Sequence, residues 1–248
     1  MALCLCVRLL DCIIAMNNHR KKIVFLVFLA LVALLSMNVK RIERILDLGV
    51  GIVMSKAVSY TIDERLAAIE EKKPHLLEKA KQTGGRLRVY VFKAERMVEL
   101  NAPGWAKPQK YPMTGFSGAL GPKLKEGDRQ IPEGCYGIEY LNPNSRFYLS
   151  LKVSYPNEFD REHAKSEGRT NPGGDIMIHG KDVTIGCIPV GDDAIEDIFY
   201  LANAVGVKNV KVVISPYDMR NGRKAELEVS EVGWYNELCE QIFKELKR

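Results

Sequence analysis

The chain has 248 residues, enough for one sizeable domain with accessory segments, and 46% of them are hydrophobic, as in proteins with a globular core. Its net charge of +5 resembles that of a nucleic-acid-binding protein, but the excess is local. Of 36 basic and 31 acidic residues, seven and two lie in residues 1–44, which leaves 29 of each for residues 45–248. A neutral body with a basic amino terminus argues against nucleic-acid binding and favours a membrane-targeting segment.

The first predicted element is an uncharged apolar run at residues 23–39, preceded by the basic residues 20–22. Seventeen helical residues span about 25 Å, slightly less than the hydrocarbon core of a bilayer, so flanking basic side chains would reach to the interface. The basic cluster predicts that residues 1–22 are cytoplasmic and that the rest is exported. No small-residue cleavage site ends the run, so we predict a single-pass transmembrane signal anchor rather than a cleaved signal peptide. Met16 offers an alternative start, in which case residues 1–15 would not be translated.

This topology divides the cysteines into two groups. Cys4, Cys6 and Cys12 precede the anchor, whereas Cys135, Cys187 and Cys239 would be exported. Three is an odd number, so at least one exported thiol has no partner in the chain in an oxidising compartment, and Cys187 is the candidate. The sequence contains no CxxC motif, and we predict neither a zinc site nor any other metal or cofactor.

Residues 40–85 are predicted to be a helical spacer between the membrane and the next domain. Thr61 and Glu64 have the spacing of a capping box, Pro74 interrupts the helical pattern, and Gly84-Gly85 ends it. A helix packed on the following domain is an equally good interpretation of the same pattern.

From residue 86 onward, alternating hydrophobic residues predict strands. The predicted strands are 87–92, 97–100, 111–117, 136–141 and 147–155, with a turn at 142–144 and a Gly- and Pro-rich turn at 127–134. We expect a mainly β fold, an antiparallel sandwich or closed barrel with a few helices. Residues 156–174 are predicted to be a long polar loop in which His163 is solvated. A helix at 192–204, a strand at 210–214 and an amphipathic helix at 231–246 follow.

The stretch from Asp175 to Pro189 carries the chemistry. His179 follows a short apolar segment, 176–178, that is typical of a buried strand, and Gly186 directly precedes Cys187. A free cysteine is mostly protonated at neutral pH, so nucleophilic attack by its sulfur needs a nearby imidazole as proton acceptor. A glycine beside the nucleophile allows a carbonyl group to approach the backbone, where N–H groups can stabilise an oxyanion. A backbone carbonyl is the favoured partner to orient His179, ahead of Asp175 or Asp182.

Three signals in order resemble a known family. GDRQIPEG at 127–134, IHG at 178–180 and TIGC at 184–187 resemble the L,D-transpeptidase (YkuD-type) catalytic domain of bacterial cell-wall enzymes. The run YPNEFDR at 155–161 is similar to the YafK-like murein transpeptidase branch. The resemblance implies a catalytic domain at about 86–216, which leaves residues 217–248 as a carboxy-terminal amphipathic helix region.

The resemblance also implies the reaction. Cys187 would be the nucleophile and His179 its base, with backbone N–H groups of Gly186 and Cys187 as the oxyanion hole and with Thr184 and Gly180 in support. The substrate would be peptidoglycan tetrapeptide stems, which would form a thioester on Cys187 that an amine acceptor, or a cell-wall-linked protein, resolves. The enzyme would serve cell-wall biosynthesis or remodelling, held in the bacterial inner membrane with its catalytic domain facing the periplasm.

Two departures from the family pattern bear on the function, and the first of them leaves alternatives open. Pro189 stands where an arginine is common, and Thr184 stands where serine is common. A peptidoglycan-linkage hydrolase of the same fold is therefore an alternative to a transpeptidase, because water can resolve the same thioester. A degenerate module that binds peptidoglycan without turnover is a second alternative, and an exported β domain in which Cys187 only packs is a third. An active enzyme is expected to hold a poised thiolate that reacts with iodoacetamide well below the pH at which an ordinary cysteine does.

Overall fold

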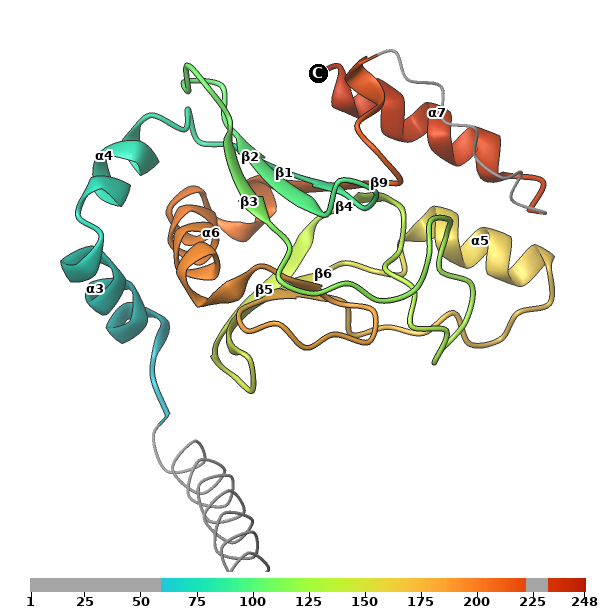
Figure 1. Cartoon of the computed structure of the whole chain (residues 1–248), viewed down its shortest axis with the longest axis horizontal. Coiled ribbons are helices and arrows are strands. Elements are labelled where there is room, and N and C mark those ends of the chain that lie inside the picture. Colours follow the sequence, from blue (N-terminus) through green and yellow to red (C-terminus); the bar gives the residue numbers. More distant parts are fainter. Residues whose placement is uncertain (1–58, 222–231) are drawn as a thin grey trace, which may run out of the picture. The chain divides into compact units, whose positions relative to one another are not determined.

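The computed structural model describes residues 59–221 and 232–248 (Figure 1). Tyr60–Arg248 form one compact unit, and Met1–Ser59 form another. The predicted membrane anchor at 23–39 lies outside the described residues. Among the residues that are described, no helix is both long and apolar enough to cross a membrane.

The first of two sheets has five strands and is mixed. Its order is β3 (Gln109–Pro112), β2 (Met97–Asn101), β1 (Leu87–Phe92), β9 (Val210–Ser215) and β4 (Gly134–Tyr136). The hairpin of β1 and β2 forms as predicted, with Phe92 opposite Met97. β9, from the far end of the chain, lies parallel to β1, whereas β4 is antiparallel to β9. The expectation of a mostly antiparallel sheet therefore holds for the hairpins but not for this central strand pair.

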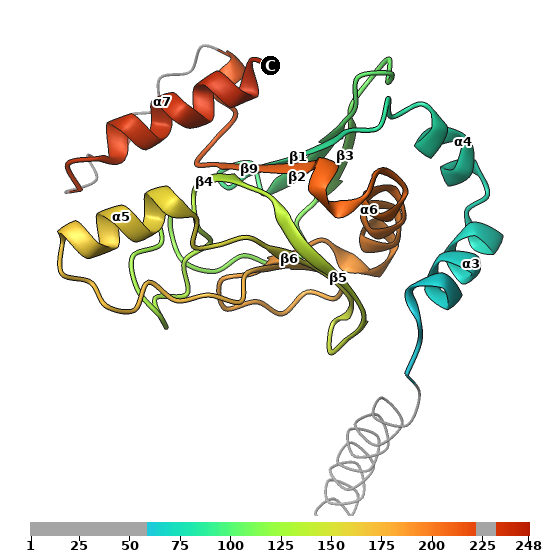
Figure 2. The same cartoon turned by 180° about the vertical axis from the view of Figure 1, so that it is seen from behind.

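Both faces of this sheet are buried. Val89 and Val91 of β1 face one hydrophobic core, and Tyr90 and Phe92 face a second one beneath helix α7 (Tyr235–Leu246). Figure 2, from behind, shows α7 lying along the sheet on the side away from β5 and β6. The alternation seen in the sequence thus separates two apolar faces rather than an apolar face from a solvated one.

The second sheet carries the reactive stretch. Its order is β5 (Ile138–Ser145), β6 (Tyr148–Val153), β7 (Met177–His179) and β8 (Ile188–Pro189). β5 and β6 form a hairpin, but the turn lies between Ser145 and Tyr148. The predicted turn at 142–144 is wrong, because these residues lie within β5 at a shift of the strand register. β7 and β8 are parallel, so this sheet is mixed as well.

Helix α6 (Gly191–Val205) shares the main core with both sheets, and Ile195, Ile198 and Phe199 are fully buried. Helices α3 (Ile62–Lys72) and α4 (His75–Lys81) pack beside it (Figure 1). The capping box of Thr61 and Glu64 forms as predicted. The helices expected in the spacer therefore belong to the same compact unit as the sheets, which is the second of the two interpretations of the sequence.

The predicted polar loop at 156–174 is wrong for nearly half of its length, because α5 (Glu158–Ser166) forms there. Asn157 caps the helix by accepting a hydrogen bond from the Asp160 N–H, and the Asp160 carboxylate accepts one from the Asn157 N–H. This capping box is worth about 1 kcal/mol and is visible in the sequence as a polar residue followed three positions later by an acid. Two short 3-10 helices, η1 (Val207–Asn209) and η2 (Met219–Asn221), flank β9.

Candidate active site

His179 ends strand β7, and Cys187 directly precedes β8, the parallel strand beside it. Ile178 is opposite Ile188 and His179 is opposite Pro189, so extending the register by one residue places Cys187 opposite Met177. The backbone N–H of Met177 indeed donates a hydrogen bond to the Cys187 sulfur. The Cys187 sulfur therefore lies beside the segment that leads to His179, where it accepts the Met177 N–H and donates to the Asp175 carbonyl.

The imidazole of His179 is completely buried and has a defined tautomer. Its Nδ1 forms a hydrogen bond with the backbone carbonyl of Gly180. A carbonyl oxygen only accepts, so Nδ1 carries the hydrogen and Nε2 holds a free lone pair. Nε2 is buried and has no hydrogen-bond partner among the described residues. A backbone carbonyl thus orients His179, as expected from the sequence, and the less favoured partners Asp175 and Asp182 do not.

Burial sets the charge of this imidazole. It lowers the pKa of His179 below its ordinary value of 6.5, and the hydrogen bond to Gly180 only partly opposes this. The ring of Phe147 stacks on the imidazole and contributes to this burial. At neutral pH the group is therefore a neutral base, which is the form able to accept a proton.

The Cys187 thiol is also neutral in this structure. Burial raises its pKa above the ordinary value of 9.0, although a hydrogen bond from the Met177 N–H and the charge of Lys123 act in the opposite direction. The Sγ donates a hydrogen bond to the Asp175 carbonyl, at 3.5 Å, and not to Nε2 of His179. The poised thiolate by which an active enzyme would be recognised is therefore not preformed in this arrangement. Rotation of the cysteine side chain away from Asp175 is needed before the two groups interact.

The loop before the nucleophile is fixed by Thr184. Its hydroxyl donates to the Cys187 carbonyl at 2.7 Å and accepts the N–H of Gly186 at 3.2 Å. Gly186 has a φ of +128°, and a Cβ there would lie 3.1 Å from the Gln130 carbonyl oxygen, so only glycine fits without strain. Of the two N–H groups predicted to bind an oxyanion, that of Gly186 is therefore engaged by Thr184. The N–H of Cys187 stays the predicted donor.

Gly180 is required because the chain is crowded behind the histidine. A Cβ at this position would lie 2.6 Å from the Asp192 carboxylate and 2.7 Å from the Phe147 carbonyl oxygen. Asp192, at the start of α6, also accepts the N–H of Lys181 at 2.9 Å. Phe147 and Asp192 are the site residues that the sequence does not single out. Phe147 begins a run of alternating hydrophobic residues, but no pattern pairs it with a histidine 32 positions later.

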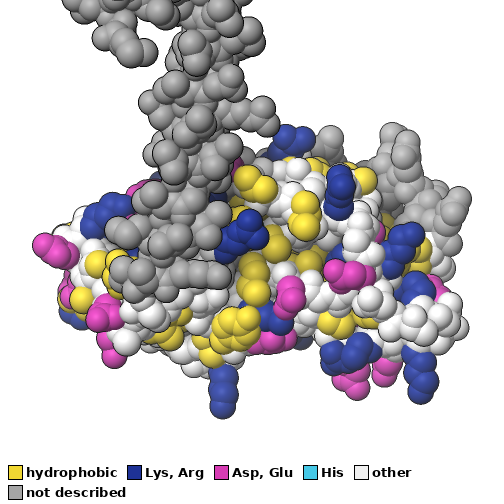
Figure 3. All heavy atoms as spheres, turned by 90° about the horizontal axis from the view of Figure 1, so that it is seen from below, with side chains coloured by type: hydrophobic (Ala, Val, Ile, Leu, Met, Phe, Trp, Pro, Cys, Tyr) yellow, Lys and Arg dark blue, Asp and Glu magenta, His cyan; other side chains and the backbone are white. Residues whose placement is uncertain are grey.

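The surface beside the nucleophile is partly apolar. Val183 and Ile185, on either side of Thr184, are 64% and 75% exposed. The view from below in Figure 3 shows that surface hydrophobic side chains lie among charged ones on this side of the domain. Within the described part of the chain, no three His, Cys, Asp or Glu side chains gather as metal ligands. The groups that the described site presents include the Cys187 thiol, the His179 imidazole and backbone N–H and carbonyl groups.

Comparisons with known proteins agree with this geometry. The sequence model of YkuD, the L,D-transpeptidase catalytic domain, matches residues 86–214. A protein of Escherichia coli (strain K12) named "Putative L,D-transpeptidase YafK" is 34% identical over 144 residues. That match covers 55% of this chain and 56% of the relative, so the chain spans about half the length of the curated relatives it matches.

Two solved structures are more distantly similar. One is a variant of the helical cell shape determining protein Pgp2 of Campylobacter jejuni, at 22% identity and a TM-score of 0.42, covering 58% of this chain and 54% of that one. The other is Bd1075 of Bdellovibrio bacteriovorus, at 21% identity and a TM-score of 0.37, covering 53% and 48%. Since the family match spans more than half of the sequence and includes both His179 and Cys187, the chain belongs to the YkuD family of L,D-transpeptidase catalytic domains.

Proposed function

We propose that this protein is a membrane-anchored cysteine acyltransferase, an L,D-transpeptidase that acts on peptidoglycan tetrapeptide stems through a thioester on Cys187. Membership of the family supports the reaction class. The observation that carries the assignment of residues is the buried, unpartnered Nε2 of His179, at the end of the strand β7 beside which Cys187 lies. A buried nitrogen without a partner is costly to stability, so its retention is best explained by a proton that it accepts during catalysis.

In the first half-reaction, Cys187 attacks the carbonyl carbon at the L-centre of diaminopimelate. As the S–C bond forms, Nε2 of His179 takes the thiol proton, while Nδ1–H stays bonded to the Gly180 carbonyl. The developing oxyanion is stabilised by the Cys187 N–H. Collapse of the tetrahedral intermediate breaks the C–N bond, and Nε2 returns the proton to the departing amine of D-alanine. The products are a thioester and free D-alanine.

In the second half-reaction, an acceptor amine attacks the thioester. Nε2 removes a proton from this amine, and the C–S bond breaks as the new amide forms. The Cys187 sulfur leaves and takes the proton back from His179, which restores the neutral pair. Water in place of the amine would release a shortened peptide. Transfer and hydrolysis therefore share every protein group and differ only in the second nucleophile.

The predicted anchor places this reaction at the cell wall. We propose that residues 23–39 cross the inner membrane once, with the catalytic unit in the periplasm. The apolar run and the basic residues 20–22 support this topology. Protease treatment of spheroplasts tests it: digestion of the catalytic unit in intact spheroplasts is expected, and protection until lysis would refute it.

The reaction is tested with the full-length protein in detergent. Wild type, Cys187→Ala and the control Cys239→Ala are incubated with tetrapeptide muropeptides, and products are read by mass spectrometry. We expect cross-linked dimers and free D-alanine from wild type and the control, and none from Cys187→Ala. Shortened peptides that depend on Cys187 would make the protein a hydrolase. Binding without any Cys187-dependent product would make it a binding module.

A further inference from the structure

Two hollows adjoin each other where α5 ends. One has a volume of about 580 Å³ and the other about 610 Å³. They share a wall made of Gly168, Arg169 and Thr170. None of the residues placed in the mechanism above lines either hollow. Their size suits a peptide side group rather than a single water molecule.

The hollows are basic. Arg161, Lys165 and Arg169 line the first, and Lys125 and Arg169 line the second. Within the described residues, Arg161, Lys165 and Lys125 take part in no ion pair, so their charges face the hollows or solvent.

Two of the three acidic groups close to the hollows are already engaged. The third, Glu126, whose carboxylate lies 2.6 Å from a Cβ built on Gly173, has no ion pair among the described residues, and it stands against three such unpaired bases. Asp128, which lines the second hollow, is paired with Lys123 at 2.5 Å and accepts three backbone N–H groups. Glu167 is paired with Arg169 at 2.7 Å and accepts the indole N–H of Trp234. An anion that enters the hollows would therefore meet uncompensated positive charge.

Arg169 is held in place with part of its guanidinium group unused. Its Nε donates to Glu167 at 2.7 Å and its Nη1 donates to the Leu124 carbonyl at 2.8 Å. Its Nη2 has no hydrogen-bond partner in the described part of the chain. A guanidinium fixed on two sides is pre-organised for a carboxylate, which forms short, charge-assisted hydrogen bonds with it.

Both hollows reach the surroundings of the nucleophile. The second is lined by Gln130, whose carbonyl oxygen lies 3.1 Å from a Cβ built on Gly186. The first is lined by Gly173, two residues before Asp175, whose carbonyl accepts the Cys187 thiol. Two residues of chain span at most about 7 Å. Each hollow thus shares a wall segment with the surroundings of the nucleophile, at Gln130 and at Gly173, although Cys187 itself lines neither.

We propose that these hollows, centred on Arg169, bind the glutamate or the diaminopimelate carboxylate of the donor stem peptide. This proposal rests on the proposed function and adds the group by which the donor is held. Pro189, two residues after Cys187, is buried and provides no positive charge for the donor. Arg169 supplies the charge that selects a donor with free carboxylates over one in which they are amidated.

The test compares two donors on the full-length protein in detergent. One is a disaccharide tetrapeptide with free carboxylates, and the other is the same compound amidated on its glutamate and diaminopimelate carboxylates. For Arg169→Gln we expect KM for the free donor to rise roughly 10- to 100-fold, the worth of a hydrogen bond between charged groups, with kcat within about twofold. For the amidated donor we expect little change.

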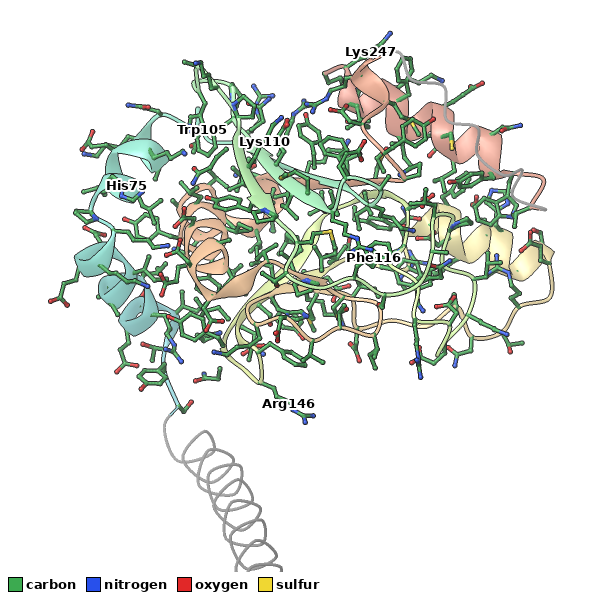
Figure 4. The ribbon with its side chains drawn as sticks, viewed as in Figure 1. His75, Trp105, Lys110, Phe116, Arg146 and Lys247 are labelled. Carbon is green, nitrogen blue, oxygen red and sulfur yellow. The ribbon has the colours of Figure 1, made fainter. Side chains whose placement is uncertain are left out.

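The matched control is Arg146→Gln. Arg146 is exposed at the β5–β6 turn and projects away from the domain (Figure 4), so its loss changes the net charge equally without touching the hollows. We expect it to leave both KM values unchanged. Lys165→Gln, which breaks no ion pair, is expected to raise KM for the free donor several-fold, and Arg169→Lys is expected to restore part of the loss.

The outcomes separate this proposal from the proposed function. An equal effect of Arg169→Gln on both donors, or none on either, would overturn the carboxylate site. Where wild type shows no turnover of either donor, the proposed function fails, and calorimetry with the Cys187→Ala protein decides the site. Tighter binding of the free than of the amidated donor, lost in a Cys187→Ala, Arg169→Gln protein, would support it, and equal binding would refute it.

Discussion

The ring of Phe147 stacks on the imidazole of His179, with centroids 4.5 Å apart and planes inclined by 28°. Phe147 also blocks the backbone behind the histidine, because its carbonyl oxygen lies 2.7 Å from a Cβ built on Gly180. Phe147 therefore restricts His179 in two ways: its ring covers one face of the imidazole, and its carbonyl oxygen crowds the backbone at Gly180. The consequence is a base that water does not reach and that stays neutral at physiological pH.

The lowered pKa of His179 predicts the acidic limb of the pH profile. Protonated imidazole cannot accept the thiol proton, so kcat/KM should fall only as the pH drops below the ordinary histidine value of about 6.5. The same shift affects stability: the unfolded chain binds the proton more readily, so stability present above about pH 6.5 is lost as the pH falls further. A pH–rate profile, beside urea unfolding at each pH, measures both.

Replacing Phe147 with leucine tests the stacking contact. Phe147→Leu keeps an apolar side chain but exposes the imidazole face, so the acidic limb should move upward, towards the ordinary pKa of histidine. We expect kcat/KM at pH 6 to decrease more than at pH 8. An acidic limb that stays in place would show that the other walls of the site exclude water without the aromatic ring.

The raised pKa of Cys187 predicts slow alkylation at neutral pH. Since the thiol is neutral and bonded to the Asp175 carbonyl, its reaction with iodoacetamide should accelerate as the pH rises past about 9. His179→Gln should decrease transfer by roughly 10²- to 10⁴-fold, the usual worth of a general base, yet leave alkylation above pH 9 nearly unchanged. Peptide mass spectrometry assigns the label to Cys187. A reaction plateau near pH 6 would instead indicate a thiolate–imidazolium pair.

Gly186 and Gly174 form a matched pair for testing the loop before the nucleophile. Gly186→Ala places a Cβ 3.1 Å from the Gln130 carbonyl oxygen at a φ of +128°, a strain of about 1–3 kcal/mol that should displace Cys187 and reduce turnover. At Gly174 a Cβ meets nothing within 4 Å, so Gly174→Ala should leave stability and turnover nearly unchanged. Thermal unfolding and the muropeptide assay measure both. Equal turnover of the two variants would mean that the loop tolerates displacement.

The sequence predicts correctly those elements whose formation depends on residues close together in the chain. The β1–β2 hairpin, the α6 helix and the Thr61 capping box follow from alternation, helical spacing and cap residues. The parallel pairing of β1 with β9 joins Leu87 to Val210, and no signal in the sequence couples segments so far apart. The missed α5 helix has a different cause, because its nine residues are largely polar and too few hydrophobic ones mark its buried side.

The residues of the site can also be divided into those that are close in sequence and those that come from distant segments. Cys187, His179 and their glycines are adjacent in sequence, and the strand–loop–strand geometry that joins them is local. The partners that set their chemistry come from elsewhere: Phe147 from the β5–β6 turn, and Gln130 from the loop before β4. The raised pKa of the thiol could not be predicted from sequence, because burial depends on the packing of the whole domain.

Lys73 tests whether the α3–α4 region is part of the catalytic unit. Its buried ammonium group pairs with Asp197 at 2.7 Å and with Glu196 at 3.2 Å, both on α6. Lys73→Met would leave Asp197 buried without a cation, which costs about 3–5 kcal/mol, while Glu196 would keep its pair with Lys72 at 2.8 Å. Lys81→Met, which removes an exposed pair with Glu78, should cost at most about 1 kcal/mol. Urea unfolding measures both effects. An equally small effect of the two substitutions would mean that α3 and α4 contribute little to the fold. Removal of residues 1–85 would then leave the active site intact.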